Sequence, residues 1–245
     1  MSEQRTVLSL RGVTKRFGGL VAVNQLDFDV AEHEVLGLIG PNGSGKSTTL
    51  NLISGALPVS EGEIALRDQI ISDLPAQKIA RRGVARTFQL VRMLPSMTVK
   101  ENVMAGAVFG HRRRWGREAD RQVMRMLELV GLERRANARP SELTYIDTKR
   151  VELARVLVGD PKVLLLDEWL AGLNPTELEE GIALVKQLRD EGRTIVLVEH
   201  VMDAIRSLCD RCVVMSSGQK IAEGVTETVL SDPEVIKAYL GEDDA

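Results

Sequence analysis

The sequence predicts an α/β fold with a mostly parallel central sheet and an antiparallel, β-rich N-terminal part. Val163–Leu166 and Thr194–Val198 are short, mainly apolar runs, as expected of strands that are buried on both faces of a parallel sheet. Thr6–Leu10 and Leu26–Val30 tend instead to alternate between apolar and polar residues, which is typical of half-buried strands at a sheet's edge. The two patterns indicate two kinds of sheet in one chain.

The bulk composition is that of an ordinary globular protein, with 44% hydrophobic and 27% charged residues. A length of 245 residues suits a single domain, 1–245, that combines a core with a subdomain. The net charge of −3 argues against a nucleic-acid-binding protein that works through a broadly basic surface. No apolar run approaches the roughly 18 residues of a membrane span, and Met1–Thr6 does not resemble a secretion signal. We therefore expect a cytoplasmic protein.

A glycine-rich stretch, Gly40–Thr48, reads G-P-N-G-S-G-K-S-T and matches the phosphate-loop pattern G-x-x-x-x-G-K-[ST]. It follows the apolar run Val35–Ile39 and leads into a predicted helix, Ser47–Ile53, so the order strand, loop, helix is correct. An ordinary glycine turn is the alternative, but it would not require this context. The residues expected to contact the phosphates are Gly40, Pro41, Asn42, Gly43, Ser44, Gly45, Lys46, Ser47 and Thr48.

The chemistry of this loop suits a nucleoside triphosphate. Glycines let backbone N–H groups point at phosphate oxygens, and the helix start adds the positive end of its dipole. Lys46 supplies a charge for the β- and γ-phosphates, and the Ser47 hydroxyl is placed to ligate Mg²⁺.

Polar residues follow both apolar runs at the expected ligand-binding edge of the sheet. Asp167 and Glu168 come directly after Val163–Leu166, and His200 closes the second run. We expect Asp167 to hold Mg²⁺ through water, Glu168 to polarise the water that attacks the γ-phosphate, and His200 to hydrogen-bond that phosphate. The alternatives are that the two acids only cap a strand and that His200 is a capping or packing histidine.

Two further residues have an open interpretation. Phe17, in a loop before the phosphate loop, is either a stacking surface for adenine or a core residue. Gln89 ends a predicted strand, Val84–Gln89, and either reaches Mg²⁺ or the attacking water or lies on the surface.

Strand signals vanish after Pro95, and Val99–Val108 and Glu118–Val130 have helical periodicity. We expect an inserted helical subdomain at about residues 95–160. The basic cluster His111–Arg117 within it is interpreted as a solvated loop, with an acidic partner surface or lipid headgroups as alternatives.

Local signals predict the remaining structure. Thr144 and Asp147 have the spacing of a helix cap before the predicted helix Thr148–Val158. Cys209 and Cys212 are interpreted as core residues, with a redox or metal role as the alternative. The other expected elements are a strand at Glu63–Leu66, a helix at Pro75–Arg82, a helix capped by Thr176 and running to about Arg189, a hairpin of Val213–Ser216 and Lys220–Glu223, and a tail helix at Glu234–Leu240.

This ordered set of motifs resembles the ATPase subunit of an ABC transporter over essentially the whole chain. Asp167 lies 121 residues beyond Lys46, which leaves room for the helical subdomain that separates this family from compact phosphate-loop GTPases. The resemblance implies ATP and Mg²⁺ as cofactors. It also implies roles by position: Phe17 as the adenine-stacking aromatic, Gly40–Thr48 as Walker A, Gln89 as the Q-loop, Asp167 and Glu168 as Walker B, and His200 as the switch histidine.

Three stretches look like the branched-chain (hydrophobic) amino-acid importer ATPases: Met97–Val103, Ala171–Glu177 and Val235–Glu242. This likeness implies a subunit that powers amino-acid import. A similar subunit with another cargo, such as urea or an aromatic acid, stays open. A soluble ABC-type ATPase acting on ribosomes or DNA is the other alternative, but such proteins usually carry a second module or a coiled coil, which a 245-residue chain without heptads lacks.

The signature motif departs from the family pattern L-S-G-G-Q, since this chain has Leu143–Asp147, L-T-Y-I-D. Thr144 keeps the hydroxyl that would touch the γ-phosphate held by the opposite subunit. Ile146 is expected to put a branched side chain where glycine allows close approach, and Asp147 a negative charge near a triphosphate.

The resemblance also implies partners. These are transmembrane permease subunits, a second ATPase subunit (a second copy or, as favoured here, a paralogue) and, indirectly, an extracytoplasmic solute-binding protein, with no nucleic acid. The expected location is peripheral, on the cytoplasmic face of the bacterial inner membrane.

Overall fold

A computed structural model of the chain describes residues 5–88 and 91–240. Its first sheet is antiparallel, with the strand order β2-β1-β4-β5. The hairpin of β1 and β2 forms most of this sheet, so the predicted N-terminal β-structure is confirmed but is longer than expected. The strands are β1 Thr6–Phe17, β2 Leu20–Ala31, β4 Glu61–Leu66 and β5 Gln69–Ile70.

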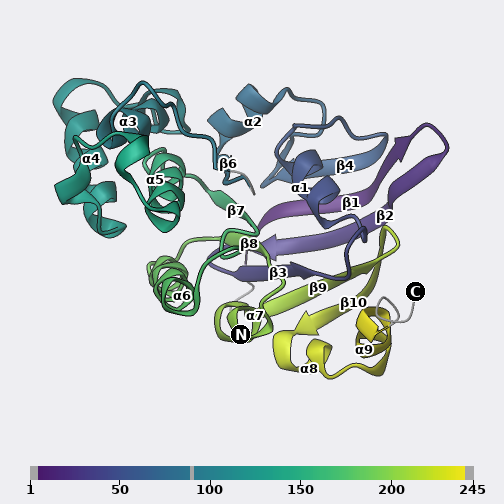
Figure 1. Cartoon of the computed structure of the whole chain (residues 1–245). Coiled ribbons are helices and arrows are strands. Elements are labelled where there is room, and N and C mark those ends of the chain that lie inside the picture. Colours follow the sequence, from purple (N-terminus) through teal and green to yellow (C-terminus); the bar gives the residue numbers. More distant parts are fainter. Residues whose placement is uncertain (1–4, 89–90, 241–245) are drawn as a thin grey trace.

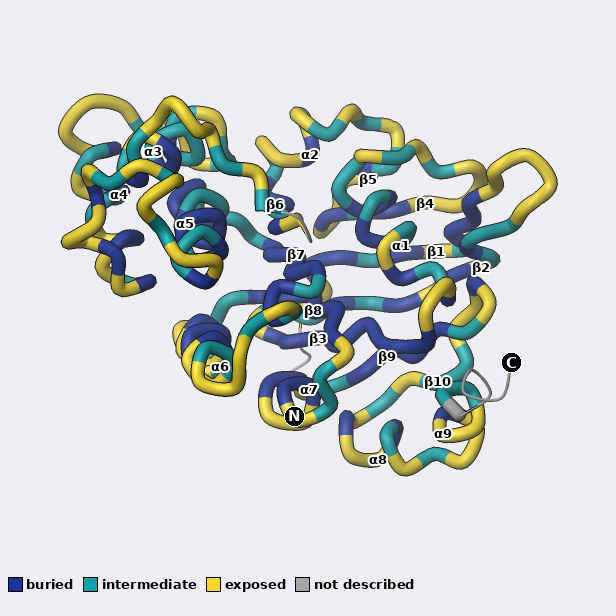
Figure 2. Tube along the Cα trace, viewed as in Figure 1, coloured by how far each residue is buried: buried dark blue, intermediate teal, exposed yellow. Residues whose placement is uncertain are grey.

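The second sheet has the order β10-β9-β3-β8-β7-β6 and is parallel except for the β9–β10 hairpin. It therefore confirms the predicted fold class. Every residue of β3, β7 and β8 is buried, and these strands are drawn dark in Figure 2. The strands are β3 Val35–Ile39, β6 Val84–Arg86, β7 Val163–Asp167, β8 Ile195–Val198, β9 Arg211–Ser216 and β10 Gln219–Val225.

Helices cover this framework, and Figure 1 shows α3, α4 and α5 gathered at one end of the molecule. They are α1 Lys46–Ile53, α2 Ala76–Arg82, α3 Val99–Phe109, α4 Gly116–Leu129, α5 Tyr145–Leu157, α6 Pro175–Asp190, α7 Met202–Leu208, α8 Thr226–Leu230 and α9 Pro233–Leu240. Short 3-10 turns lie at Glu133–Arg135 and Pro140–Glu142.

The parallel sheet separates two hydrophobic cores, which explains its uninterrupted apolar strands. Leu164 and Leu166 belong to the core shared with α3 to α7, whereas Leu165 belongs to the core between the two sheets, which also holds α1 residues. Because successive side chains of a strand point to opposite faces, each position must be apolar.

The helices α3 to α5 connect β6 to its parallel neighbour β7. They bury their apolar faces in the same core as α6 and α7. The division into a core and an inserted helical subdomain at about 95–160 stays a proposal.

Several boundaries differ from the predictions. Phe17 is the last residue of β1 and does not lie in a loop. The strand predicted to end at Gln89 ends at Arg86, and Gln89 lies outside the described residues. The helix predicted from Thr148 begins at Tyr145, because Thr144 already caps it.

The cap of α6 was also predicted wrongly. Asn174, not Thr176, caps this helix, and its Oδ1 accepts a hydrogen bond from Glu177 N at 3.0 Å. A Pro at the first helical position suits this arrangement, because its missing N–H is not needed there.

The C-terminal predictions are confirmed: β9 and β10 form the hairpin, and α9 is the tail helix. Cys209 and Cys212 are free and buried in the core, as the packing interpretation requires. Within residues 5–88 and 91–240, no helix is both long and apolar enough to cross a membrane.

Candidate active site

The glycine-rich loop between β3 and α1 is pressed against two other strands. Gly40 has φ +144°, and a Cβ added there would lie 2.0 Å from Met215 O. Gly45 has φ +104°, and its added Cβ would lie 2.6 Å from Ala22 O. Both positions therefore exclude any side chain, and the loop backbone is held in place by its neighbours.

The interior of the loop offers donors suited to an anion. Lys46 is 5% exposed, and its Nζ donates to Gly40 O and Pro41 O at 2.7 Å each. The buried Ser44 hydroxyl has no hydrogen-bond partner among the described protein atoms. A cavity of about 160 Å³ opens here and is lined by Ala22, Asn42, Gly43, Gly45, Lys46, Ser47, Thr48 and Glu168.

Glu168 joins the cavity from the carboxyl end of β7. Its φ of +47° is uncommon for a non-glycine residue, and its N–H donates to Val198 O on the neighbouring strand at 2.9 Å. Its Oε1 lies 3.0 Å from His200 Nε2. The fold thus brings together three predicted parts of the site: the phosphate loop, Glu168 and His200.

Asp167 is held beside this cavity by an arginine that sequence reasoning missed. Arg86 NH2 donates to Asp167 Oδ2 at 2.6 Å, and both side chains are nearly buried. The available signal was Arg86 itself, a charged residue in a short strand among small and apolar neighbours, because a buried charge needs a partner.

Glu199, next to His200, was also missed. It is 2% exposed, and its Oε1 accepts a hydrogen bond from Leu170 N at 2.6 Å. Burial raises the pKa of Glu199 to about 7, and the negative charge of Glu168 adds to this rise. The hydrogen bond from Leu170 and the positive charge of Lys149 lower the pKa in part. The carboxyl edge of β7 and β8 therefore gathers three carboxyl groups.

The start of α5 holds the signature residues Thr144, Ile146 and Asp147. Thr144 Oγ1 accepts from Asp147 N at 3.3 Å, which confirms the predicted cap. Ile146 is only 6% exposed in this chain, and its expected effect on a nucleotide held by the opposite subunit stays a prediction. Asp147 lies 3.9 Å from Arg150, which offsets its charge.

Lys149 links the same helix to the residue after Glu168. It is 1% exposed, and its Nζ donates to Trp169 O at 2.9 Å, while Trp169 Nε1 donates back to Lys149 O at 3.3 Å. The Lys149 ammonium also lies 5.0 Å from the centre of the half-exposed Tyr145 ring. No sequence pattern pointed to this contact.

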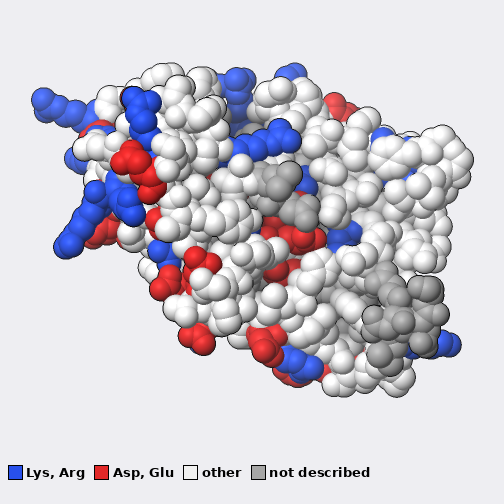
Figure 3. All heavy atoms as spheres, in the orientation of Figure 1, with Lys and Arg blue, Asp and Glu red and all other residues white. Residues whose placement is uncertain are grey.

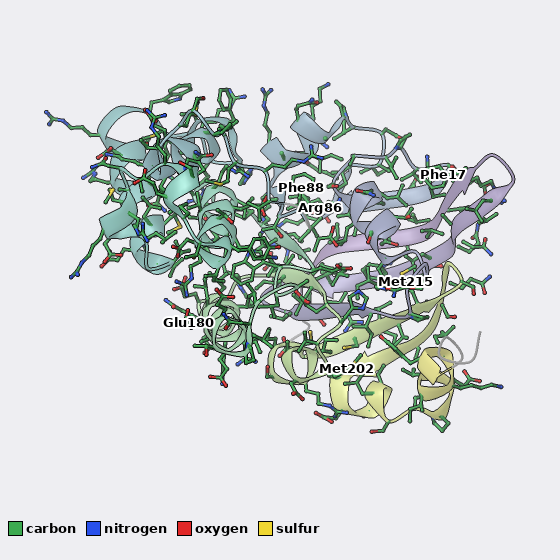
Figure 4. The ribbon with its side chains drawn as sticks, in the orientation of Figure 1. Phe17, Arg86, Phe88, Glu180, Met202 and Met215 are labelled. Carbon is green, nitrogen blue, oxygen red and sulfur yellow. The ribbon has the colours of Figure 1, made fainter. Side chains whose placement is uncertain are left out.

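Phe17 is 45% exposed, so it is not a core residue. Its ring faces Lys15 Nζ, 5.2 Å from the ring centre, and it lies on the β1–β2 hairpin (Figure 4). It does not line the phosphate-loop cavity. Its stacking role stays a prediction, and the predicted role of Gln89 falls outside the described residues.

The basic cluster His111–Arg117 is partly anchored to the protein. Arg112 Nε lies 3.1 Å from Asp160 Oδ2, and Arg114 NH1 donates to Val158 O at 2.9 Å. Figure 3 shows Lys and Arg side chains projecting from the left end of this face, around α3 and α4.

The donors at the cavity fit Mg²⁺ bound together with a nucleotide. Among residues 5–88 and 91–240, no group of three or more His, Cys, Asp or Glu side chains could hold a metal ion by itself. Ser47 and Asp167 offer oxygen atoms, and Mg²⁺ typically takes one or two such ligands together with phosphate oxygens and water.

Comparison with known proteins identifies the family. A family model described as ABC transporter matches residues 23–171. The chain belongs to the ABC transporter family. A second model, described as branched-chain amino acid ATP-binding cassette transporter, matches residues 219–245 of this ABC ATPase.

Curated relatives match nearly the whole of this ABC ATPase. It is 42% identical to the high-affinity branched-chain amino acid transport ATP-binding protein LivG of Escherichia coli K12, over 96% of this chain and 98% of LivG. It is 41% identical to the corresponding protein BraF of Pseudomonas aeruginosa, over 97% and 99%. The predicted resemblance is therefore confirmed.

Solved structures agree. The ATP-binding cassette MJ1267 in its ADP conformation superposes with a TM-score of 0.88 at 31% identity, covering 96% of this chain and 99% of that one. The dimeric cassette MJ0796 with ADP and Pi gives 0.80 at 28%, covering 89% and 98%. This ABC ATPase thus binds nucleotide and hydrolyses ATP, and ATPases of its family form dimers that work with membrane permeases.

Proposed function

We propose that this chain is the ATP-hydrolysing subunit of an importer for branched-chain or other hydrophobic amino acids. The match of residues 219–245 to a branched-chain amino acid transporter model supports this cargo, as do the names of the relatives above. Urea or an aromatic acid is the rival cargo, because permease and binding protein choose the solute. Action on ribosomes or DNA is not favoured, since these relatives are transport proteins.

The observation that carries the proposed chemistry is the 3.0 Å contact between Glu168 and His200 at the phosphate-loop cavity. In the proposed reaction, Glu168 orients or deprotonates the water that attacks the γ-phosphate in line. His200 keeps the Glu168 carboxylate in place and hydrogen-bonds the γ-phosphate.

The phosphate loop Gly40–Thr48 is proposed to hold the nucleotide. Its amides and the start of α1 would face the phosphates, and Lys46 would leave the Gly40 and Pro41 carbonyls to meet the β- and γ-phosphates. Phe17 would stack on the adenine.

Ser47, Asp167 and Gln89 are the residues proposed to hold Mg²⁺, with Asp167 acting through water. Bound there, Mg²⁺ would supply positive charge that offsets the charge developing on the phosphate oxygens. The fixed position of Asp167, paired with Arg86, supports its part in this set.

A second ATPase subunit is proposed to complete the site, with its own signature motif facing this chain's nucleotide. Thr144 of this chain would in turn contact the nucleotide of that partner, which is a paralogue or a second copy. Permease subunits would convert closure of the dimer into transport, fed by a solute-binding protein, and would hold the ATPase at the cytoplasmic face of the membrane.

The test of the proposed chemistry is Glu168→Gln. This variant should bind ATP but hydrolyse it at least ~10²-fold more slowly, the usual scale for loss of a general base. The matched control is Glu179→Gln on the exposed face of α6, which should hydrolyse ATP at the wild-type rate. Near-normal hydrolysis by Glu168→Gln would remove Glu168 from this role.

The cargo needs a separate experiment. The permease subunits and binding protein that work with this chain should be identified and reconstituted with it in proteoliposomes. Uptake of leucine, isoleucine or valine that depends on ATP would support the proposal, whereas uptake of urea or an aromatic acid alone would contradict it.

A further inference from the structure

Arg86 is a nearly buried cation that none of the roles above requires. Its side chain is 7% exposed, and that of its partner Asp167 is 6% exposed. The 2.6 Å bond from NH2 to Asp167 Oδ2 joins two full charges away from water. Such charge-assisted bonds are strong and directional, so this contact fixes how the carboxylate is turned.

The other end of the guanidinium reaches the helix that begins the phosphate-loop site. Arg86 NH1 donates to Asn51 Oδ1 at 2.7 Å and lies 3.2 Å from Ser54 Oγ. Asn51 belongs to α1, whose first two residues are Lys46 and Ser47. One planar group therefore connects α1 to the end of β7.

The surroundings of Arg86 reinforce this connection. Its neighbour Thr87 accepts from Asp167 N at 3.4 Å and donates its own N–H to Leu165 O at 3.0 Å. The Phe88 ring covers the guanidinium, with 5.4 Å between the Arg86 Cζ and the ring centre, and the two residues lie side by side in Figure 4. Exclusion of water strengthens the charged contacts.

We infer that Arg86 is a positioning residue for the proposed Mg²⁺ site, because it orients the Asp167 carboxylate and sets its spacing from α1. This inference rests on the proposed role of Asp167. Partners that hold a metal-binding carboxylate typically matter ten- to a hundredfold for metal affinity or activity. Lysine keeps the charge of arginine but cannot reach both partners with one planar fork.

The experiment measures metal binding and not turnover. Mn²⁺ serves as the probe for Mg²⁺, and free Mn²⁺ is measured by electron paramagnetic resonance in the presence of saturating ADP and the full-length chain. Arg86→Lys should raise the Mn²⁺ Kd by about ten- to a hundredfold. Its affinity for ADP in EDTA, measured separately, should match that of the wild type.

Arg211→Lys is the matched control. Arg211 also pairs with a buried carboxylate, Glu34, at 2.8 Å, but at the start of β9, on the opposite edge of the parallel sheet. This substitution should leave the Mn²⁺ Kd unchanged even if it lowers the Tm. In addition, Arg86→Lys should add nothing to the effect of Asp167→Asn when the two are combined, because both act through one carboxylate.

Asn51→Ala provides a variant that keeps the buried ion pair, in case Arg86→Lys does not fold. It frees one end of the guanidinium and should raise the Mn²⁺ Kd about threefold, the scale of one hydrogen bond. A lower Tm with unchanged Mn²⁺ affinity in the Arg86 or Asn51 variant would overturn the inference. An unchanged Mn²⁺ Kd in Asp167→Asn would overturn the role of Asp167 itself, and absent ADP binding by the wild type would overturn the proposed function.

Discussion

The carboxyl edge of β7 and β8 and the helix α5 are built in different ways, although each holds a buried glutamate, Glu199 at the edge and Glu152 in the middle of α5. The carboxyl edge assembles its groups from separate segments, namely the phosphate loop, Glu168 and His200. The start of α5 is one continuous capped helix, in which Ile146 and Lys149 turn inward. The first region brings together groups that the proposed chemistry uses, whereas the second buries Ile146 and Lys149 within this chain.

This difference teaches that the two proposed ATP sites of a dimer need not be equal. The changed residues at the start of α5 would face the partner's nucleotide and not this chain's own. The Lys149–Trp169 contact still connects α5 to the residue beside Glu168, so the two regions are mechanically joined within one subunit.

The proposed inequality of the two ATP sites is tested most directly in a reconstituted transporter that contains a paralogous second ATPase. Glu168→Gln should lower turnover by ~10²-fold or more, whereas the equivalent substitution in the partner should lower it by less than about tenfold, because that site is completed by this chain's altered signature. ATP turnover is measured for each variant in turn. Equal losses from the two substitutions would show that the asymmetry is absent.

Lys149→Met tests the link between the regions. Removal of the ammonium leaves Trp169 O without its buried donor, and a missing buried partner usually costs about 1–3 kcal/mol of unfolding free energy. Urea unfolding provides the measurement. Lys186→Met, on the exposed face of α6, is the control and should change stability little. A Lys149 variant as stable as this control would show that the Lys149–Trp169 contact does not stabilise the fold.

A pH titration compares the two buried glutamates. Burial raises the pKa of both Glu199 and Glu152 to about 7, from an ordinary value of 4.5. The folded state therefore binds protons more tightly than the unfolded state, so the stability that these two groups contribute is fully present below pH 4.5 and is lost as the pH rises through about 7.

The variants Glu199→Gln and Glu152→Gln assign this decline to one region or the other. Each should flatten the pH dependence of unfolding free energy by roughly 2 kcal/mol at most. For Glu199 the neighbouring charges are Lys149 and Glu168, while Arg155 and Lys149 act on Glu152. A pH dependence of the unfolding free energy that is identical in wild type and variants would contradict the raised pKa values.

The contrast between the two regions also explains which structural features could be predicted from the sequence. The apolar runs before Asp167 and His200 predicted strands and the edge where their polar ends meet, because burial on both faces leaves few other arrangements. Arg86, Glu199 and Lys149 were missed, because their partners come from segments distant in the chain. The direction of the Ile146 side chain depends on the residue at which α5 begins. The first residue of a helix is harder to predict from a sequence than the presence of the helix.

The smallest expected effect concerns the cap at the start of α5. Thr144→Ala should cost about 1 kcal/mol of unfolding free energy, since the Asp147 N–H loses its acceptor. Thr144→Ser keeps the hydroxyl and should be nearly neutral in both stability and transporter turnover. If Thr144 also contacts the partner's nucleotide, Thr144→Ala should lower turnover measured well below the melting temperature, where lost stability alone has no effect. Wild-type turnover by Thr144→Ala would confine this hydroxyl to the cap.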